Sequence, residues 1–279
     1  MKDRVTLTLD RGILKVVDER IDGVHVKNRS HAVELLIRQS LHGSAPIAAV
    51  ILAGGKGTRL KPLTDKLPKS LVPVNSKPIL QYNIDLCKRY NIKNIIISVG
   101  HMAEQIMDHY GDGSKFGVNI TYVHEKEPMG TAGPLRMIKE KLNGTFVLMN
   151  ADELKDINLA KMFQAHLENG GKATIALTTV EDPSAYGVAM MDGNKIVRFV
   201  EKPKKDEAPS KLINAGLYLL EPEIISLIPE GYAMMEFDVF PKLAKDSLLF
   251  GYPFSGQWFD IGTPERLQKA AKEWKGFQN

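Results

Sequence analysis

The alternation of apolar and polar residues separates a short first segment of the chain from a long second one. Residues 4–9 alternate strictly, which predicts a strand with one apolar face. Apolar residues then recur at helical spacing over residues 11–21, and again from about residue 30 up to Gly43. We therefore expect a small strand–helix–helix domain over residues 1–43, joined to the rest of the chain by a short linker that contains Pro46.

The second segment, residues 47–275, begins as a series of apolar strands separated by helical patterns. Strands are predicted at residues 47–52, 94–99, 118–123 and 145–149, and helices at residues 78–90, 102–110 and 131–142. This order is typical of an α/β fold with a Rossmann-like, mostly parallel sheet and helices on both of its faces. Ligands of such sheets bind at the carboxyl ends of the strands.

The pattern becomes antiparallel after about residue 180. Residues 186–191 and 195–200 flank an Asp-Gly-Asn turn, which predicts a hairpin, and residues 213–220 form a further strand. A last strand at residues 248–253 and a helix at residues 264–274 complete the pattern. We expect the hairpin region to be an antiparallel insert that carries substrate contacts.

Composition restricts the possible functions only mildly. The chain of 279 residues is 43% hydrophobic and 25% charged, an ordinary globular mixture. Its formal net charge of +4 suits anionic substrates but is far from that of a polybasic nucleic-acid tail. The single cysteine, Cys87, excludes a disulfide framework and a cysteine-based zinc site. Without a signal peptide or a long apolar run, we expect a soluble, cytoplasmic protein that does not enter the membrane.

A glycine-rich stretch after the strand at residues 47–52 carries the strongest chemical signal. Glycines let backbone N–H groups approach a phosphate closely, and arginine and lysine supply charge for its oxygens. The spacing fits neither the Walker A loop nor the dinucleotide fingerprint. We therefore interpret the stretch as a triphosphate-binding loop, whose candidate residues are Ala53, Gly54, Gly55, Gly57, Thr58, Arg59 and Lys69.

The sequence Gly-Gly-x-Gly-Thr-Arg followed by Pro-Lys resembles the signature of the sugar-1-phosphate nucleotidyltransferases. Members of that family join a nucleoside triphosphate (NTP) and a sugar 1-phosphate into a nucleotide sugar and release pyrophosphate. The resemblance covers residues 47–275 and assigns catalytic roles to Arg59 and Lys69. It also implies Mg²⁺, held by Asp152 and Asp260, although a helix cap or a turn would explain either acid alone.

Further segments of the same resemblance imply a sugar site and a base site. The runs AYGV, VEKP and NAGLY are similar to the family's sugar-binding segments, and they assign this role to Gly187, Glu201, Lys202, Asn214 and Gly216. The run HEKEPMGTAGPL places Gly130 and Thr131 beside the nucleobase, with Glu125 at the position that reads its edge.

Glu125 favours GTP as the nucleotide. Guanine presents two adjacent N–H donors, which a carboxylate can accept, whereas a pyrimidine needs a donor and an acceptor. The run EPMGTAGPL is most similar to mannose-1-phosphate guanylyltransferases, so mannose 1-phosphate is the favoured sugar. The alternatives are a uridylyl- or thymidylyltransferase that acts on glucose 1-phosphate, and a plain solvated charge run around Glu125.

The first domain resembles a ribbon-helix-helix domain through RVTLTL and NRSHAVELLIR. That resemblance implies a dimer built through the N-terminal domain, and it implies DNA as a possible partner. Base reading would fall to Arg4, Thr6 and Thr8, and phosphate contact to Asn28, Arg29 and Ser30. Residues 1–45 hold eight Lys/Arg and six Asp/Glu, a small excess for a DNA-binding domain. Two classes therefore remain open, an enzyme with a dimerisation domain and a DNA-binding regulator that senses a nucleotide sugar.

Overall fold

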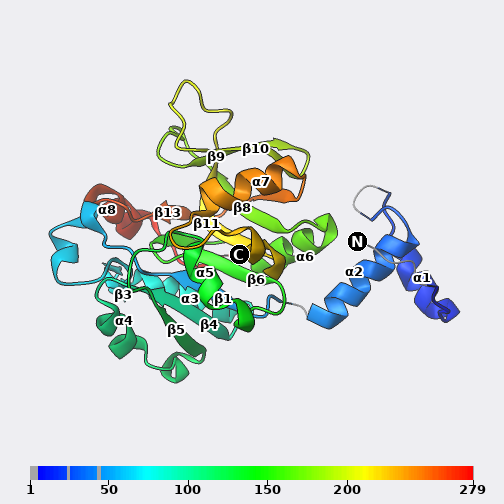
Figure 1. The fold of residues 1–279 in the computed structure, drawn as a ribbon, viewed down its shortest axis with the longest axis horizontal. Coiled ribbons are helices and arrows are strands. Elements are labelled where there is room, and N and C mark those ends of the chain that lie inside the picture. The colour runs from blue at the N-terminus through cyan, green and yellow to red at the C-terminus, as the bar shows by residue number, and fades with distance from the viewer. Residues whose placement is uncertain (1–5, 24–25, 43–44, 279) are drawn as a thin grey trace.

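The computed structural model describes residues 6–23, 26–42 and 45–278. Its centre is a sheet that has, in this described part, nine strands in the order β5-β4-β1-β6-β11-β8-β12-β10-β9 (Figure 1). The strands are β1 (Ala49–Leu52), β4 (Asn94–Val99), β5 (Asn119–His124), β6 (Phe146–Asn150), β8 (Ala173–Thr179), β9 (Gly187–Asp192), β10 (Lys195–Glu201), β11 (Leu212–Leu220) and β12 (Leu249–Pro253).

Two short antiparallel pairs and a set of helices complete the described part. The pairs are β2 (Pro73–Val74) with β3 (Lys77–Pro78), and β7 (Glu153–Lys155) with β13 (Trp258–Asp260). The α-helices are α1 (Arg11–Glu19), α2 (Arg29–His42), α3 (Ile79–Arg89), α4 (Ala103–Tyr110), α5 (Gly133–Met137), α6 (Leu159–Asn169), α7 (Phe240–Lys245) and α8 (Pro264–Glu273). Among these described helices, none combines the length and the apolar character needed to cross a membrane.

The sheet is parallel in its first half and mixed in its second. Strands β5, β4, β1 and β6 pair in parallel, as their alternation with helices predicts. Strand β11 then pairs antiparallel with both β6 and β8, while β12 pairs parallel with β8. The hairpin β9–β10 continues the same sheet. The α/β prediction is confirmed, but the antiparallel strands extend the central sheet and do not form a separate insert.

Both faces of the sheet are covered, as expected for strands that read as continuous apolar runs. In β1, Ala49 and Ile51 belong to one hydrophobic core and Val50 to the other. Helices α3, α4 and α6 pack on the first core, and α5 and α7 on the second. This two-sided burial fixes the strands, so their carboxyl ends form a stable edge for a site.

Helix α5 is much shorter than the helix predicted over residues 131–142. Gly130 has a φ of 75°, and a side chain there would come within 2.3 Å of the Ala233 carbonyl oxygen. The Ala132 N–H donates to that same carbonyl at 2.9 Å. Because of this tight packing against the segment around Ala233, the helix begins only at Gly133. It ends at Met137, and a 3₁₀ turn at Lys139–Lys141 follows in place of the rest of the predicted helix.

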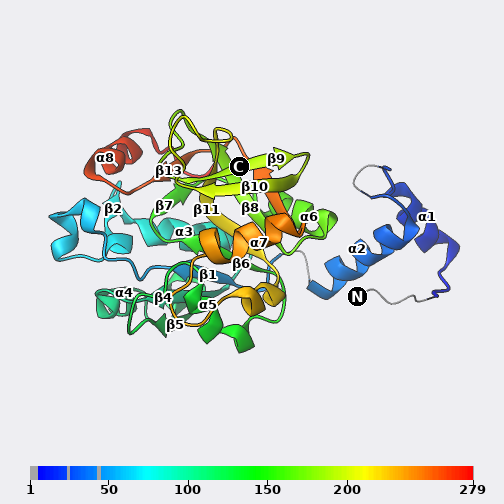
Figure 2. The same ribbon diagram turned by 45° about the horizontal axis from the view of Figure 1, so that its top comes forward.

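The N-terminal helices lie beside the α/β domain, with α2 packed against α6 (Figures 1 and 2). The strand predicted at residues 4–9 is not formed in its described part, residues 6–9, while Arg4 and Val5 lie outside the described residues. A ribbon strand needs a neighbouring strand for its backbone hydrogen bonds, and one chain alone provides none here. The two predicted helices are confirmed, and the strand is not.

Candidate active site

The glycine loop, residues 53–59, leaves the carboxyl end of β1 and packs against the segment that carries Lys69. Gly57 has a φ of 64°, and a side chain at this position would lie 2.9 Å from the Lys69 Cβ and from the Thr64 Cγ2. The Thr64 hydroxyl donates to the Gly57 carbonyl at 2.8 Å. Because of this close contact, position 57 requires glycine, and the loop and Lys69 are held together.

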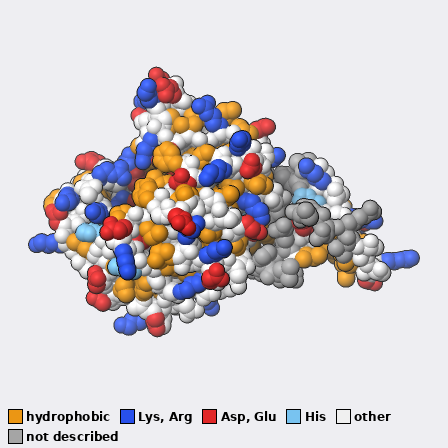
Figure 3. All heavy atoms as spheres, viewed as in Figure 1, with side chains coloured by type: hydrophobic (Ala, Val, Ile, Leu, Met, Phe, Trp, Pro, Cys, Tyr) orange, Lys and Arg blue, Asp and Glu red, His pale blue; other side chains and the backbone are white. Residues whose placement is uncertain are grey.

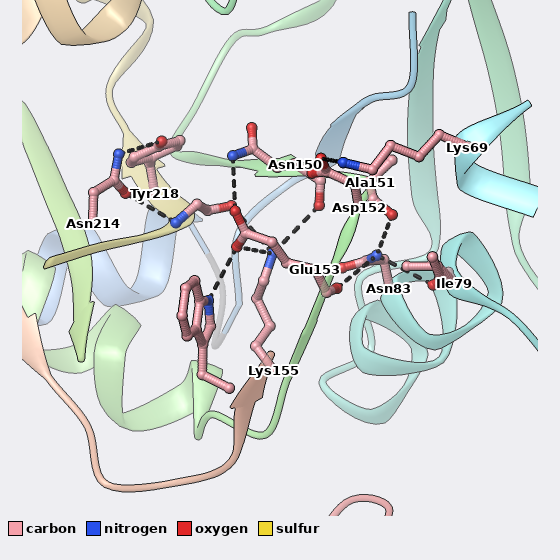
Figure 4. A network of polar contacts seen from close by, with 12 residues as sticks. Lys69, Ile79, Asn83, Asn150, Ala151, Asp152, Glu153, Lys155, Asn214 and Tyr218 are labelled. Atoms are coloured by element: carbon pink, nitrogen blue, oxygen red, sulfur yellow. Dashed lines mark hydrogen bonds and ion pairs between the residues drawn. The ribbon is translucent and has the colours of Figure 1, made fainter. Parts of the chain in front are cut away.

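Lys69 meets Asp152 just beyond the end of β6 (Figure 4). The Lys69 ammonium donates to the Asp152 carboxylate, and the two side chains are 11% and 33% exposed. Burial favours the neutral acid, but Lys69 and then Lys155 outweigh it and lower the pKa of Asp152. An ionised carboxylate and a cation therefore stand together at the sheet edge, next to the glycine loop.

The pairing of β7 with β13 brings Asp260 to the same edge. Asp260 lies opposite Glu153 in this pair, and the Ile261 N–H donates to the Asp152 carbonyl at 3.0 Å. Burial and the nearby Asp152 raise the pKa of Asp260, although Arg266 offsets part of this rise. Arg266 donates to the Asp260 carboxylate, and its guanidinium lies 5.4 Å from the centroid of the Tyr186 ring.

This pair of acids fits a hard divalent cation. Burial and then the charge of Asp152 raise the pKa of Asp260, and both carboxylates offer the oxygen ligands that Mg²⁺ prefers. Mg²⁺ is commonly held by one or two carboxylates together with substrate phosphates. Over the described ranges, no group of three or more His, Cys, Asp or Glu side chains is suited to a metal. Asp152 and Asp260 are the candidate residues that could hold Mg²⁺ together with substrate phosphates.

Glu125 is fixed in place beside the glycine loop. It follows β5, and its two carboxylate oxygens accept hydrogen bonds from the Ser98 hydroxyl at 2.7 Å and from the Met129 N–H at 3.1 Å. A side chain at Gly54 would come within 2.7 Å of the carboxylate. Glu125 is thus no freely solvated charge. Its remaining lone pairs can accept hydrogen bonds from a ligand that enters over Gly54.

The loop after Glu125 is held by a second buried acid. Thr131 donates from its hydroxyl to Glu236 at 2.5 Å, and the Met235 N–H donates to the same hydroxyl at 2.9 Å. Glu236 is 7% exposed and also accepts from the Tyr218 hydroxyl at 3.5 Å. These bonds fix the loop at Gly130 and Thr131 against the segment 233–236.

The predicted sugar residues fall into two neighbouring groups. Glu201 lies opposite Gly187 in the β9–β10 pair, and a side chain at Gly187 would come within 2.7 Å of its carboxylate. Burial, and then the charge of Glu236, raises the pKa of Glu201. The second group lies on β11, where the Gly216 N–H donates to the Asn214 side chain at 2.9 Å.

A cavity of about 470 Å³ opens between these elements. The predicted residues that line it are Ala53, Gly54, Gly55, Arg59, Lys69, Glu125, Gly130, Thr131, Asp152, Glu201 and Lys202. The predicted residues outside its lining are Gly57, Thr58, Gly187, Asn214, Gly216 and Asp260. Of these, Asp260 faces a second cavity of about 610 Å³ together with Tyr186 and Arg266. The structure therefore brings most of the phosphate and base candidates and Asp152 around one cavity, while Asp260 faces the second one.

Several lining residues were not predicted from the sequence. Asn150, Tyr232, Met234 and Glu236 border the cavity, and Glu153 and Lys155 lie buried behind Asp152. The signal available for Glu236 was that it is one of two acids, with Asp238, in the otherwise apolar run AMMEFDVF. Tyr232 lies in a loop, outside the periodic patterns that identify helices and strands, so its place at the cavity could not be predicted from them.

The candidate DNA-binding residues have local roles in the N-terminal helices. The Asn28 side chain accepts from the His31 N–H at 3.0 Å, and Arg29 forms two hydrogen bonds with Asp18, at 2.6 and 2.7 Å. Thr6, Thr8 and Ser30 are exposed, and Arg4 lies outside the described residues. Figure 3 shows basic and acidic side chains interspersed over the visible face of the α/β domain.

The sequence is similar to that of known proteins. Residues 48–275 match the family described as Nucleotidyl transferase. The chain is 40% identical over 223 residues to mannose-1-phosphate guanyltransferase 2 of Candida glabrata, covering 77% of this chain and 61% of that protein. It is 39% identical over 231 residues to a UTP–glucose-1-phosphate uridylyltransferase of a Synechocystis species, covering 77% of this chain and 60% of that protein.

A solved structure shows the same fold. The crystal structure of HddC from Yersinia pseudotuberculosis, complexed with GMP-PN, superposes with a TM-score of 0.70 at 27% identity, covering 82% of this chain and all of that one. The chain spans about three fifths of the length of the curated relatives described above. Since the family match covers most of the sequence, from residue 48 to residue 275, the chain belongs to the nucleotidyl transferase family.

Proposed function

We propose that this chain transfers a nucleoside monophosphate from an NTP, with GTP favoured, to a sugar 1-phosphate, with mannose 1-phosphate favoured. A phosphate oxygen of the sugar 1-phosphate attacks the α-phosphorus of the NTP. The bond from that phosphorus to the bridging oxygen breaks, and pyrophosphate leaves with the bond's electron pair. The observation that carries the proposal is the meeting of Lys69 and Asp152 beside the glycine loop, in one cavity with Arg59.

The reaction needs positioning and charge more than it needs a base. The attacking phosphate is already largely ionised at neutral pH, because its second pKa is about 6. Arg59 and Lys69 supply positive charge where the phosphates of the NTP would lie. Mg²⁺ held by Asp152 and Asp260 would neutralise charge on the reacting phosphates. The protein's task is then to hold two anions in line at close range.

The preference for GTP rests on Glu125 and on similarity. Its carboxylate is oriented by Ser98 and Met129, so it offers acceptors to the two donors of guanine without further cost of ordering. Relatives such as the Candida glabrata protein are named for guanylyl transfer to mannose 1-phosphate. The Synechocystis relative is named for uridylyl transfer to glucose 1-phosphate, and this remains the alternative substrate pair.

The same proposal gives the N-terminal region, residues 1–43, the role of a ribbon-helix-helix-like dimerisation domain. Leu7, Ile13, Val16 and Ile37 are between 46% and 54% exposed, although all four are large and apolar. A second copy would cover such a surface and would supply a partner strand for residues 6–9. A regulator that binds DNA is the alternative of another class. Arg29, the arginine among the candidate phosphate contacts, is already paired with Asp18 of the same region, and this favours the enzyme over the DNA-binding regulator.

A substrate grid tests the reaction. Pyrophosphate release is measured for each common NTP with each of several sugar 1-phosphates, in the presence of Mg²⁺ and then of a chelator. The proposal expects release that requires both substrates and the metal, and that is fastest with GTP and mannose 1-phosphate. Release with UTP and glucose 1-phosphate only would select the alternative enzyme. Sequence-selective DNA binding without any turnover would select the regulator.

A further inference from the structure

A buried ion pair lies behind the proposed metal site, outside the residues that the reaction uses directly. Lys155 Nζ lies 3.4 Å from the Glu153 carboxylate, and the two side chains are 1% and 10% exposed. Both residues belong to the short strand β7. Burying two charges costs free energy unless each is paired and hydrogen-bonded. The hydrogen-bond partners of Lys155 and Glu153 therefore indicate the role of the pair.

The pair bonds to three segments that meet at the site (Figure 4). Lys155 Nζ donates to the carbonyl of Gly216 at 3.2 Å and to that of Asn150 at 3.4 Å. Glu153 accepts from the Asn150 side chain at 3.1 Å and from the Trp258 indole at 3.2 Å. Asn150 precedes Asp152 by two residues, Trp258 precedes Asp260 by two, and Gly216 lies on the β11 segment of the predicted sugar residues.

The position of the lysine coincides with a break in the sheet. The ladder between β6 and β11 ends where Met149 pairs with Leu217, one residue short of Asn150 and Gly216. On its other side, β11 shifts register against β8 between Asn214 and Tyr218. Gly216 lies inside that irregularity with a φ of 58°. The Lys155 ammonium therefore bridges one carbonyl of β6 and one of β11 at the place where the pairing of these two strands stops.

Space at Gly216 shows how closely the parts fit. A side chain there would come within 2.2 Å of the Glu153 carboxylate and 2.6 Å of the Asn150 side chain. The Gly216 N–H in turn donates to Asn214, whose amide donates to the Tyr218 hydroxyl at 2.8 Å. The bulge on β11 is thus held from one side by its own strand and from the other by the ion pair.

We propose that Lys155, together with Glu153, is a positioning residue that fixes the Gly216 bulge relative to the Asp152 strand end and so sets the affinity for the sugar 1-phosphate. The inference rests on the proposed function. The glycine loop and Glu125 follow β1 and β5, on the opposite side of β6 from β11, so we expect the pair to affect binding of the sugar 1-phosphate more than binding of the NTP. An apolar pair of equal volume can be as stable, but it would remove the Lys155 donor from the two carbonyls.

The test separates positioning from stability with two variants and one control. Lys155→Met leaves Glu153 buried without its cation, and we expect a large fall in the melting temperature. Glu153→Gln combined with Lys155→Met removes both charges, and we expect most of that loss to be recovered. The control is Lys172→Met, which removes a partly buried lysine that directly precedes β8 and pairs with Glu223 at 3.2 Å.

Steady-state kinetics and calorimetry are then measured on all four proteins, with GTP and mannose 1-phosphate as the probes. In the double variant we expect the KM for the sugar 1-phosphate to rise roughly 10- to 100-fold while the KM for GTP stays unchanged. Calorimetry with an unreactive GTP analogue should show the same loss of sugar-phosphate binding. The control should match the wild type in every readout.

Four results would overturn the inference. One is a double variant that recovers its melting temperature and keeps the wild-type KM for the sugar 1-phosphate. Another is an equal rise in both KM values. If the double variant does not fold, Trp258→Phe replaces it, since it removes only the indole donor to Glu153, and an unchanged sugar KM there counts against positioning. A wild-type protein that makes no nucleotide sugar overturns the proposed function itself, and this inference with it.

Discussion

The smallest scale at which the function can be argued is that of a few charged side chains. In this structure Asp152 forms a salt bridge with Lys69, and Asp260 forms one with Arg266. Asp152 is held ionised, while burial and repulsion raise the pKa of Asp260. Such an unequal pair is typical of a functional cluster, because a structural ion pair has no need of two adjacent acids.

Lys69→Ala should reduce turnover by about 10²- to 10³-fold, because it removes a preorganised charge from the phosphate site. The fold should survive, since the Lys69 side chain bonds to Asp152 and is not part of the three hydrophobic clusters. Initial rates at saturating substrates check this, with Lys66→Ala in the same loop as the exposed control. A Lys69 variant with the wild-type rate would remove this residue from the mechanism.

Glu125→Gln should lose part of the preference for GTP over UTP. The amide keeps the size of the side chain but replaces one acceptor with a donor, which suits a pyrimidine edge better than a guanine edge. The ratio of kcat/KM for GTP to that for UTP measures the effect. Glu127→Gln, on an exposed side chain two residues away, is the matched control. An unchanged ratio in the Glu125 variant would assign base recognition to other residues.

At the scale of helices and strands, the sequence predicts the parallel half of the sheet well. The strand predicted at residues 94–99 is β4 itself, because a strand buried on both faces needs an uninterrupted apolar run. Strand β7 and its partner β13 have three residues each, too few for any periodicity to appear. The residues on them that matter, Glu153, Lys155 and Trp258, were missed for that reason.

Long-range contacts explain the other difference at this scale. Residues 131–142 show the helical pattern, but the glycine at position 130 and the carbonyl of Ala233 meet across about a hundred residues of sequence. The same limit applies to Glu236, which reaches Thr131 from a distant segment. Most of the motif residues line one cavity, whereas the residues that support them from other elements could not be identified from local patterns.

A buried acid at the other end of the strands gives a prediction on stability. Glu221 follows β11 and accepts from the Thr145 hydroxyl at 2.6 Å, with His166 Nε2 at 3.1 Å. Burial opposes its charge, but hydrogen bonds from His166 and Thr145 prevail and lower its pKa from 4.5 to about 2. Because the unfolded chain then binds more protons between these two values, stability rises with pH through that window and falls as acid is added.

Glu221→Gln should therefore remove a contribution on the order of 3 kcal/mol at neutral pH, and this loss should shrink as the pH falls below 4.5 towards 2. Urea unfolding at neutral pH and at several acidic values measures it. Glu223→Gln, two residues away and 63% exposed in its ion pair with Lys172, should change little. Parallel acid-unfolding curves for the wild type and the Glu221 variant would show that the network holds no stabilising charge.

At the scale of the whole molecule, the two N-terminal helices lie beside the α/β domain (Figure 2). Val17, Ala32 and Leu35 are buried in the N-terminal region, yet Ile13 and Val16 on the same first helix are 52% and 50% exposed. A helix that is apolar on more than one side needs a further partner. The proposed dimer supplies that partner and would tether two catalytic domains.

The full chain should accordingly be a dimer at micromolar concentration, and Ile13→Glu should shift it to a monomer by placing a charge in the apolar contact. Light scattering coupled to size-exclusion chromatography gives the mass directly. Met190→Glu, at a methionine 43% exposed on β9, is the control and should remain dimeric. A wild-type monomer would contradict the dimerisation role. Dissociation of both variants alike would place the interface elsewhere.

The transfer reaction itself is tested most directly by following labelled oxygen. Mannose 1-phosphate carrying ¹⁸O in its phosphate is incubated with GTP, Mg²⁺ and the enzyme, and both products are analysed by mass spectrometry. Because a sugar-phosphate oxygen attacks the α-phosphorus of GTP, all of the label should appear in the nucleotide sugar, with unlabelled pyrophosphate formed in equal amount. Label in the pyrophosphate, or no nucleotide sugar from any NTP and sugar 1-phosphate, would contradict this account.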